Sequence, residues 1–160
     1  MKSTAKKSLI ILYSYHHKNT EKIANSIAAV LESQIKKPQD IIPDEINEYT
    51  LVGFGAGIDS GKHYKPILEF ADNLPSVNGR KVFIFSTAGL SSKKKVFKDH
   101  KALREILLSK GYDVVSEFGC KGYNTNSVLK YIGGMNKGKP NDEDLKNAED
   151  FARELKQHIT

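Results

Sequence analysis

The feature of this chain that most constrains its fold is a regular alternation of short apolar runs with longer amphipathic stretches. Runs of apolar, β-branched or aromatic residues predict buried strands, and they occupy residues 9–13, 51–56, 81–86 and 112–120. The intervening stretches predict helices at residues 19–34, 66–74, 100–110 and 140–159. Because strands that alternate with helices build a parallel sheet covered on both faces, the sequence predicts a doubly wound α/β domain.

A fifth strand completes the predicted sheet. A short edge strand is expected near residues 40–42, between Pro38 and Pro43, since proline is tolerated at sheet edges. The glycine-rich segment 57–61 is expected to be a loop, and the connection 124–139 is long enough to be functional unless a short helix at 128–132 accounts for it. No linker, repeat or low-complexity tract is visible, so residues 1–160 are expected to form a single domain.

Composition restricts the classes of protein to which the chain can belong. A single cysteine, Cys120, excludes an internal disulfide framework and a multi-cysteine metal site, and it agrees with a reducing cytosol. The longest apolar run, residues 9–13, is far too short to span a membrane, and no signal-peptide cleavage site follows it. A cytoplasmic protein without membrane association is therefore expected.

An excess of positive charge bears on the partners of the protein. The formal net charge is +6, and much of the excess lies in Lys93, Lys94, Lys95, Lys98 and Lys101. These lysines form either a solvated helix face or a docking patch for an acidic partner, since charges at an interface rim mainly set encounter rates. Nucleic-acid binding is not expected, because the lysines belong to no nucleic-acid-binding module with interleaved aromatic or arginine residues.

The segments that follow the strands are where a ligand is expected. Open parallel sheets bind ligands beyond the carboxyl ends of their strands, which points to residues 14–20, 55–64, 86–90 and 119–123. All four segments are rich in glycine, hydroxyl or aromatic residues. Turns favour such residues in any protein, but four such segments at one edge of a sheet indicate a binding site.

The first of these segments carries the features of a phosphate site. It joins a buried strand to a helix whose first amides lack internal partners and whose dipole favours an anion. The hydroxyls of Ser14 and Thr20 and the cation of Lys18 would add to such a site; the alternative is that Asn19 or Thr20 simply caps the helix. The segment lacks the glycine spacing of triphosphate and dinucleotide loops, which favours the single phosphate of a mononucleotide.

The segment around this first loop resembles a motif of a known protein family. Residues 13–24, reading YSYHHKNTEKIA, resemble the phosphate loop of flavodoxins. Asn19 and Thr20 match that motif directly, whereas Lys18 replaces its glycine, and Tyr15 and His17 replace hydroxyl residues.

The resemblance extends over nearly the whole chain. Residues 53–64, reading GFGAGIDSGKHY, resemble the second flavin loop of short flavodoxin-like proteins and of flavodoxin-like protoporphyrinogen oxidases. Residues 85–89, reading FSTAG, resemble the third flavin loop, and residues 118–122 and 132–141 resemble the tail of the short subgroup.

The resemblance implies a five-stranded parallel sheet in the flavodoxin-like order 2-1-3-4-5 and one FMN held without a covalent bond. Tyr64 and Tyr123 are implied as candidates to stack on the flavin ring, and the glycines of 57–61 to bring backbone close to its edge. The residues implied to bind the cofactor are Ser14, Tyr15, His16, His17, Lys18, Asn19, Thr20, Ala56, Gly57, Ile58, Asp59, Ser60, Gly61, Lys62, Tyr64, Ser86, Thr87, Ala88, Gly89, Cys120, Gly122 and Tyr123.

Three functions remain open on the sequence alone. The first is an electron carrier that exchanges electrons with redox partner proteins as a monomer or weak dimer. The second is an FMN-dependent oxidoreductase acting on a small substrate, either a quinone reductase or a protoporphyrinogen-oxidase-like enzyme, with His63, Tyr64 or Tyr123 near the ring. The third is a doubly wound binding module without flavin, which follows if the replacements in the first loop close the phosphate site.

Other groups of reactive residues point less clearly to chemistry. His16, His17 and His63 are not expected to hold a metal, because adjacent histidines rarely chelate one ion and no acidic partner is near in sequence. Cys120 is expected to pack as an inert thiol, and Ser86 lacks the sequence context of a hydrolase nucleophile. No catalytic acid, base or nucleophile is therefore predicted.

Overall fold

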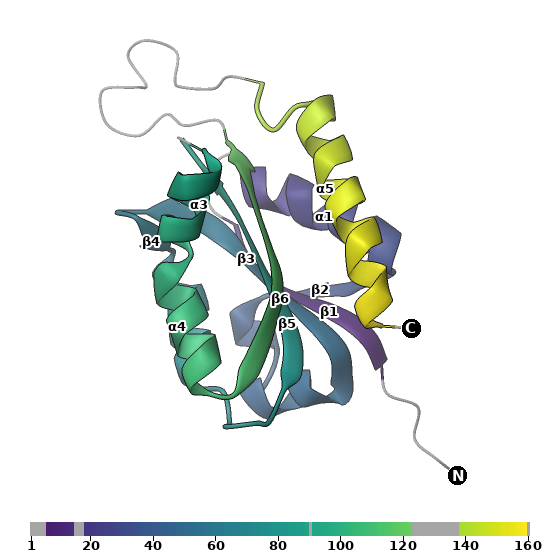
Figure 1. Ribbon diagram of the computed structural model, residues 1–160, viewed down its shortest axis with the longest axis vertical. Coiled ribbons are helices and arrows are strands. Elements are labelled where there is room, and N and C mark those ends of the chain that lie inside the picture. Colours follow the sequence, from purple (N-terminus) through teal and green to yellow (C-terminus); the bar gives the residue numbers. More distant parts are fainter. Residues whose placement is uncertain (1–5, 15–17, 90, 123–137, 160) are drawn as a thin grey trace.

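The computed structural model describes residues 6–14, 18–89, 91–122 and 138–159, which form one twisted parallel sheet with helices on both faces (Figure 1). The sheet order is β2-β1-β3-β5-β6, with β4 paired to the end of β3. The strands are β1 Lys6–Tyr13, β2 Gln34–Lys36, β3 Tyr49–Asp59, β4 Lys62–His63, β5 Arg80–Ala88 and β6 Tyr112–Lys121. The helices are α1 Asn19–Leu31, α2 Lys65–Asp72, α3 Lys93–Asp99, α4 Lys101–Ser109 and α5 Asp142–Leu155, with short 3-10 helices at Pro38–Asp40, Pro43–Glu48 and Lys156–His158.

The predicted fold class and strand order are confirmed. Without the short β4, the five parallel strands follow the order 2-1-3-4-5. Helices α1 and α5 cover one face and α2, α3 and α4 the other (Figure 1). None of the helices among the described residues is long and apolar enough to cross a membrane.

The two apolar layers of the core lie on opposite faces of the same strands. One layer packs β-strand residues such as Phe54 and Ile84 against α2 and α4, and the other packs Phe83 and Phe85 against α1 and α5. Gly55 of β3 gives the second layer its room, because a Cβ atom there would lie 2.1 Å from Cζ of Phe85. Alternate residues of each strand thus serve different helix layers, as the pleat requires.

The edge strand predicted near residues 40–42 is wrong. The edge strand is β2, which pairs in parallel with β1 so that Leu9 lies opposite Gln34. Helix α1 ends earlier than predicted because Glu32 adopts a left-handed conformation, with φ of 56°, and redirects the chain into β2. Pro38 and Pro43 begin 3-10 helices. The first residue of a helix has no internal acceptor for its amide, so proline loses no hydrogen bond there.

The loop predicted at residues 57–61 is also wrong. Strand β3 continues to Asp59 and turns into β4, so that Ile58 lies opposite His63. Ser60 and Gly61 have φ of 54° and 79°, and two successive positive φ values are typical of the tight hairpin turns that match strand twist. The segment is therefore a hairpin that extends from the carboxyl end of the sheet.

A further helix, α3, precedes the helix predicted at residues 100–110. It carries the lysine-rich segment, and the Ser92 side chain caps it by accepting the amide of Lys95. The segment predicted as a short helix at 128–132 lies outside the described residues.

Candidate functional site

The carboxyl ends of the central strands bring the predicted loops to one edge of the sheet. Tyr13 lies opposite Ala56, Ala56 opposite Ser86, and Ser86 opposite Gly119. The amide of Gly122 donates to the carbonyl oxygen of Ala88 at 2.9 Å, which joins the last two loops. Predicted site residues that lie far apart in the sequence therefore meet across four neighbouring strands.

The turn between β1 and α1 places Lys18 at the N-cap of the helix in a left-handed conformation, with φ of 53°. This conformation explains why the family motif has glycine at the position. The interpretation of Asn19 or Thr20 as a helix cap is wrong, because both lie inside the helix. The Ser14 hydroxyl instead accepts the amide of Glu21 at 3.3 Å.

Access to this turn comes from a groove of about 570 Å³ beside it. Ser14 and Lys18 line the groove, which continues along β2 to Asp40. Of the described donor groups of the turn, Ser14 and Lys18 therefore border a solvent-open groove, whereas Thr20 is buried beneath them.

A pair of buried hydroxyls connects α1 to β5 just below the turn. The Oγ1 atoms of Thr20 and Thr87 lie 2.8 Å apart, and both side chains are almost fully buried. On the other side, Asn19 packs against Gly122, where a Cβ atom would lie 2.7 Å from Nδ2 of Asn19. The two contacts fix the first turn of α1 against the ends of β5 and β6.

The donor set at this turn suits a phosphate monoester. Each hydroxyl of the threonine pair has a further hydrogen-bonding position available, since a hydroxyl both donates and accepts. The amides and dipole of a helix N-terminus favour an anion, and the Lys18 ammonium adds a positive charge. Hydroxyls, helix N-terminus and cation together match the groups that recognise a phosphate.

The hairpin at the end of β3 carries an aromatic side chain back toward this turn. The Tyr64 ring contacts Tyr13 edge to face, with ring centroids 5.9 Å apart and planes at 77°. A Cβ atom at Gly57 would lie 2.6 Å from Cε2 of Tyr64, so glycine is required for this close approach. Because Tyr64 remains partly exposed, its ring is available to cover a flat ligand.

The remaining predicted site residues divide into three groups. Ala88 and Gly89 are half-buried at the end of β5, and Ile58 is half-buried in the hairpin, whereas Asp59, Ser60, Gly61 and Lys62 form its exposed tip. Burial, together with the charge of Asp144, raises the pKa of Cys120 to about 12, so its side chain is a packed thiol rather than a nucleophile. Tyr15, His16, His17 and Tyr123 lie outside the described residues.

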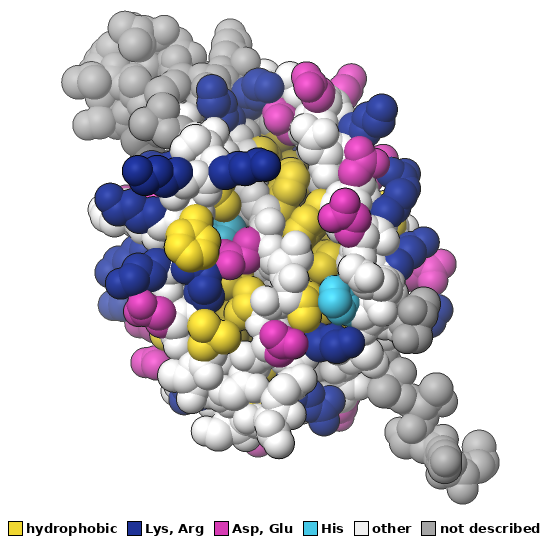
Figure 2. Space-filling view, in the orientation of Figure 1, with side chains coloured by type: hydrophobic (Ala, Val, Ile, Leu, Met, Phe, Trp, Pro, Cys, Tyr) yellow, Lys and Arg dark blue, Asp and Glu magenta, His cyan; other side chains and the backbone are white. Residues whose placement is uncertain are grey.

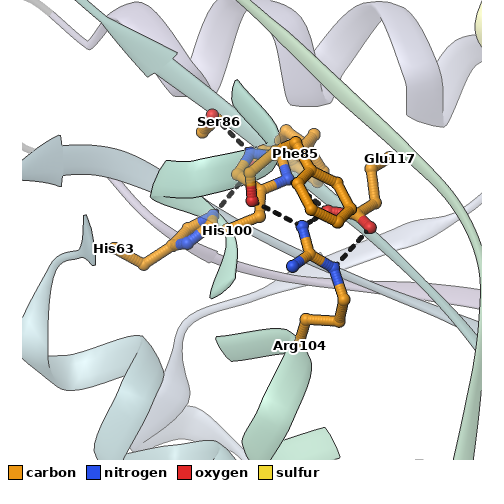
Figure 3. A network of polar contacts seen from close by, with 7 residues as sticks. His63, Phe85, Ser86, His100, Arg104 and Glu117 are labelled. Atoms are coloured by element: carbon orange, nitrogen blue, oxygen red, sulfur yellow. Dashed lines mark hydrogen bonds and ion pairs between the residues drawn. The ribbon is translucent and has the colours of Figure 1, made fainter. Parts of the chain in front are cut away.

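Sequence reasoning missed a buried network of charged and polar side chains next to this edge (Figure 3). Nδ1 of His100 lies 2.8 Å from Oε1 of Glu117, and its Nε2 lies 2.7 Å from Oγ of Ser86. Arg104 completes the network by donating to both carboxylate oxygens of Glu117, at 2.8 and 2.9 Å. The members come from β5, α4, β6 and the junction before α4, where His100 is completely buried.

A second buried histidine contacts the first without sharing its partners. The rings of His63 and His100 have centroids 4.8 Å apart. Nε2 of His63 donates to the carbonyl oxygen of Phe85 at 3.1 Å, while its Nδ1 is buried with no hydrogen-bond partner among the described residues. Figure 3 shows the two rings side by side below the end of β5.

Charge is distributed unequally over this network. Burial alone would raise the pKa of Glu117, but hydrogen bonds from His100 and Arg104 outweigh it and hold the pKa at about 2. Burial, assisted by the neighbouring His100, lowers the pKa of His63 to about 3. Glu117 is therefore a carboxylate and His63 a neutral imidazole at physiological pH.

Ser86, His100 and Glu117 have the connectivity of a serine-hydrolase triad, but the serine is not accessible. Ser86 is only 2% exposed and His100 is not exposed at all. Val96 lies over the adjacent Gly119, where a Cβ atom would be 2.6 Å from its Cγ2. A substrate cannot reach Oγ of Ser86, so Ser86 cannot act as a catalytic nucleophile. The network instead holds β5, β6 and α4 together. The spacing of His100 and Arg104, one helical turn apart, was a signal in the sequence for a shared partner.

The lysine-rich face of α3 lies beside an apolar groove (Figure 2). Phe97 is 64% exposed, and the Arg104 guanidinium lies 4.0 Å from the centroid of its ring. The groove has a volume of about 580 Å³ and runs between α3 and β6 past Val96 and Phe118. Lys93 lines the groove, and Lys94 and Lys98 are exposed on the same helix; within the described residues no acidic side chain pairs with these three lysines.

Comparisons with known proteins agree with this architecture. The sequence model of one family, described as a flavodoxin domain, matches residues 10–158. An uncharacterized protein of Methanocaldococcus jannaschii is 48% identical over 149 residues, which cover 93% of this chain and 97% of that protein.

Solved structures of flavodoxins share the fold. The oxidised flavodoxin 2 of Bacillus cereus matches with a TM-score of 0.71 and 17% identity, over 96% of this chain and 99% of its own. A flavodoxin from the domain Archaea matches with a TM-score of 0.66 and 18% identity, over 96% and 98% of the two chains.

Proposed function

The chain belongs to the flavodoxin domain family, and from this premise we propose that it binds one FMN without a covalent bond and works as an electron carrier. The observation that carries the proposal is the turn before α1. There a helix N-terminus, the Thr20–Thr87 hydroxyl pair and Lys18 form a donor set for one phosphate at the carboxyl edge of a parallel sheet. FMN, when bound, supplies the electron-transfer chemistry.

Different residues would bind the phosphate and the ring of such a cofactor. The Lys18 ammonium, the Ser14 and Thr20 hydroxyls and the first amides of α1 would bind the phosphate. The ends of β3 and β5, with their half-buried backbone at Gly57 and Ala88, would face the ring, and Tyr64 would cover it and exclude water. The third alternative from the sequence, a phosphate site closed by the replacements at Tyr15, His17 and Lys18, depends in part on residues outside the described ranges, and the titration below tests it.

An electron carrier needs no acid, base or nucleophile beside its cofactor. Of the acid–base groups found near the edge, His100 is completely buried, and the Glu117 carboxylate accepts hydrogen bonds from His100 and Arg104 although it lines the groove beside α3. This favours a carrier over the alternative oxidoreductase. The reducing cytoplasm is the compartment we propose, since the one cysteine is a buried free thiol.

The lysines of α3 suit an acidic redox partner. Lys93 lines the groove together with the exposed Phe97, and Lys94 and Lys98 are exposed on the same short helix, so an apolar anchor lies beside positive charge. Oxidation of the reduced FMN protein by ferricyanide, an anionic acceptor, tests this surface. Replacing the three lysines by glutamate is expected to slow the reaction several-fold at low salt, and an unchanged rate would argue against a role for this face in attraction.

The proposed function is tested by titrating the protein with FMN and with riboflavin while following flavin fluorescence. Saturable quenching is expected for FMN, with riboflavin bound at least about tenfold more weakly because it lacks the phosphate. No saturable binding of FMN would overturn the proposal. Mixing the FMN protein rapidly with NADH or NADPH then distinguishes the alternatives, since fast direct reduction would favour the oxidoreductase.

A further inference from the structure

Two consecutive residues of β5 connect the proposed cofactor edge to different layers of the molecule. Thr87 bonds to Thr20 on the α1 face, whereas Ser86 bonds to His100 on the α4 face. Successive side chains of a strand point to opposite faces, so both contacts begin within the last three residues of β5, residues 86–88, at the edge proposed for the cofactor. The first contact contains no ionisable group, and the second ends in the partly buried Arg104–Glu117 ion pair.

We propose that Ser86, His100 and Glu117 form a proton-holding relay, in which His100 takes up a proton when an electron arrives at the neighbouring cofactor loop. This inference rests on the proposed function, because it needs a redox group at that loop. Ser86, His100 and Glu117 act as positioning residues, since none of them has to touch the cofactor.

The geometry defines two proton arrangements of the relay. With a neutral His100, Nδ1 donates its hydrogen to Glu117, and Nε2 accepts the hydroxyl hydrogen of Ser86. When a proton from solvent forms a new N–H bond at Nε2, that group donates to Oγ of Ser86 instead. The Ser86 hydroxyl keeps its O–H bond and only turns its hydrogen away from Nε2, so the new N–H bond is the one covalent change.

The charges around His100 set the condition for proton uptake. Glu117 faces it from β6 and Arg104 from α4, and their opposite charges cancel. His63 faces it from β4 as a neutral ring, and the neighbouring Asp99 is paired with Lys95 within α3. A proton on His100 therefore leaves one uncompensated positive charge in the interior, which is costly unless a negative charge appears close by.

His63 is a built-in control for this proposal. It is as deeply buried as His100 and lies against it, but a carbonyl oxygen rather than a carboxylate accepts its hydrogen. Without an anion to stabilise the imidazolium, His63 stays neutral in both oxidation states. Only one of two adjacent imidazoles should therefore respond to an electron at the loop.

The experiment uses protein labelled with ¹⁵N in its histidines, whose ring nitrogens report tautomer and protonation by NMR. Spectra are recorded against pH for the free chain, for the FMN complex and for the FMN complex reduced under anaerobic conditions. We expect His100 to bind its proton at least tenfold more tightly after reduction, and His63 to remain neutral throughout. By linkage, the reduction potential should depend on pH to the same extent.

Two variants separate the relay from a merely structural network. Glu117→Gln should reduce the response of His100 to reduction to less than threefold, because the carboxylate is lost. Ser86→Ala keeps the His100–Glu117 pair, so His100 should still hold hydrogen to Glu117 while its response to reduction becomes weaker. His63→Gln is the matched control and should leave the response of His100 intact, with melting curves showing that each variant is folded.

The outcomes distinguish this inference from the function on which it rests. If the fluorescence titration shows no FMN binding, both proposals fall together. If FMN binds and His100 changes its proton affinity by less than twofold on reduction, the relay alone is overturned. Should Glu117→Gln fail to fold, the wild-type and Ser86→Ala spectra still decide the question.

Discussion

The last residues of β5 make different polar contacts on the two faces of the sheet. On the α1 face, Thr20 and Thr87 form a neutral hydroxyl pair that holds the helix N-terminus in place. On the α4 face, Ser86 leads to a histidine, a carboxylate and a guanidinium. The neutral pair suits a ligand group of constant charge, such as a phosphate. The ionisable network suits a neighbouring group whose charge changes, such as a cofactor that is reduced and reoxidised.

The two contacts should also contribute differently to the free energy of unfolding. A neutral hydroxyl pair contributes about 1 kcal/mol, and a buried hydroxyl that loses its one partner costs about 1–3 kcal/mol. The Glu117 carboxylate accepts three hydrogen bonds, two from Arg104 and one from His100, so its removal from this partly buried network leaves more groups without a partner. The α4 face should therefore dominate stability and the α1 face ligand binding, and substitutions can test this division.

The largest effect is expected on the α4 face. Glu117→Gln removes the anion that holds His100 and Arg104, and it should destabilise the fold by about 3 kcal/mol at neutral pH. Urea unfolding measures the change. The exposed Lys101–Glu105 pair provides the control, since Glu105→Gln should change stability by less than about 0.5 kcal/mol.

The same carboxylate should make stability depend on acid. Its pKa is about 2 in the folded chain against 4.5 for an ordinary glutamate, so the unfolded chain binds the proton more readily. The stabilisation is complete above pH 4.5 and is lost as the pH falls toward 2. Glu117→Gln should flatten this part of the stability profile, and an unchanged acid slope in the variant would contradict the assignment.

The second effect concerns the α1 face and ligand binding. Replacing both Asn19 and Thr20 by alanine should weaken FMN about 100-fold, because the change removes the Thr20 hydroxyl from the proposed phosphate site and the Asn19 side chain that packs against Gly122 and holds the turn in place. Riboflavin, which lacks the phosphate, should lose less than about threefold. Parallel fluorescence titrations measure both ligands, and equal losses would count against a phosphate role for this turn.

The α1 face was largely predictable from the sequence and the α4 face was not. The first loop follows directly from a buried strand and opens a helix, so local pattern was enough to place Ser14, Lys18 and Thr20 together. The network on the α4 face joins residues from β4, β5, α4 and β6, which only the packed fold brings together. The spacing of His100 and Arg104 indicated a shared partner, but nothing in the sequence identified Glu117 as that partner.

The local errors have similar physical causes. The sequence indicated a glycine loop at 57–61, because glycine permits both loops and tight turns, and the hairpin was decided by pairing with His63. The edge strand was misplaced because Glu32, an ordinary helix former, adopts a positive φ that no side-chain preference signals. Both misplaced segments were decided by tertiary packing over local propensity.

The smallest expected effect compares the two ends of α1, where Lys18 and Glu32 have nearly the same left-handed backbone, with φ of 53° and 56°. Glycine relieves that strain but loosens the unfolded chain, so each substitution by glycine should stabilise the fold by only about 0.5–1 kcal/mol. Thermal unfolding measures this gain. The two variants should separate in ligand binding, because Lys18→Gly also removes a cation from the proposed phosphate site and should weaken FMN about threefold to tenfold. Glu32→Gly, at the far end of the helix, should bind FMN as the wild type does. Equal FMN affinities in both variants would mean that the Lys18 backbone, rather than its charge, is what the turn before α1 requires.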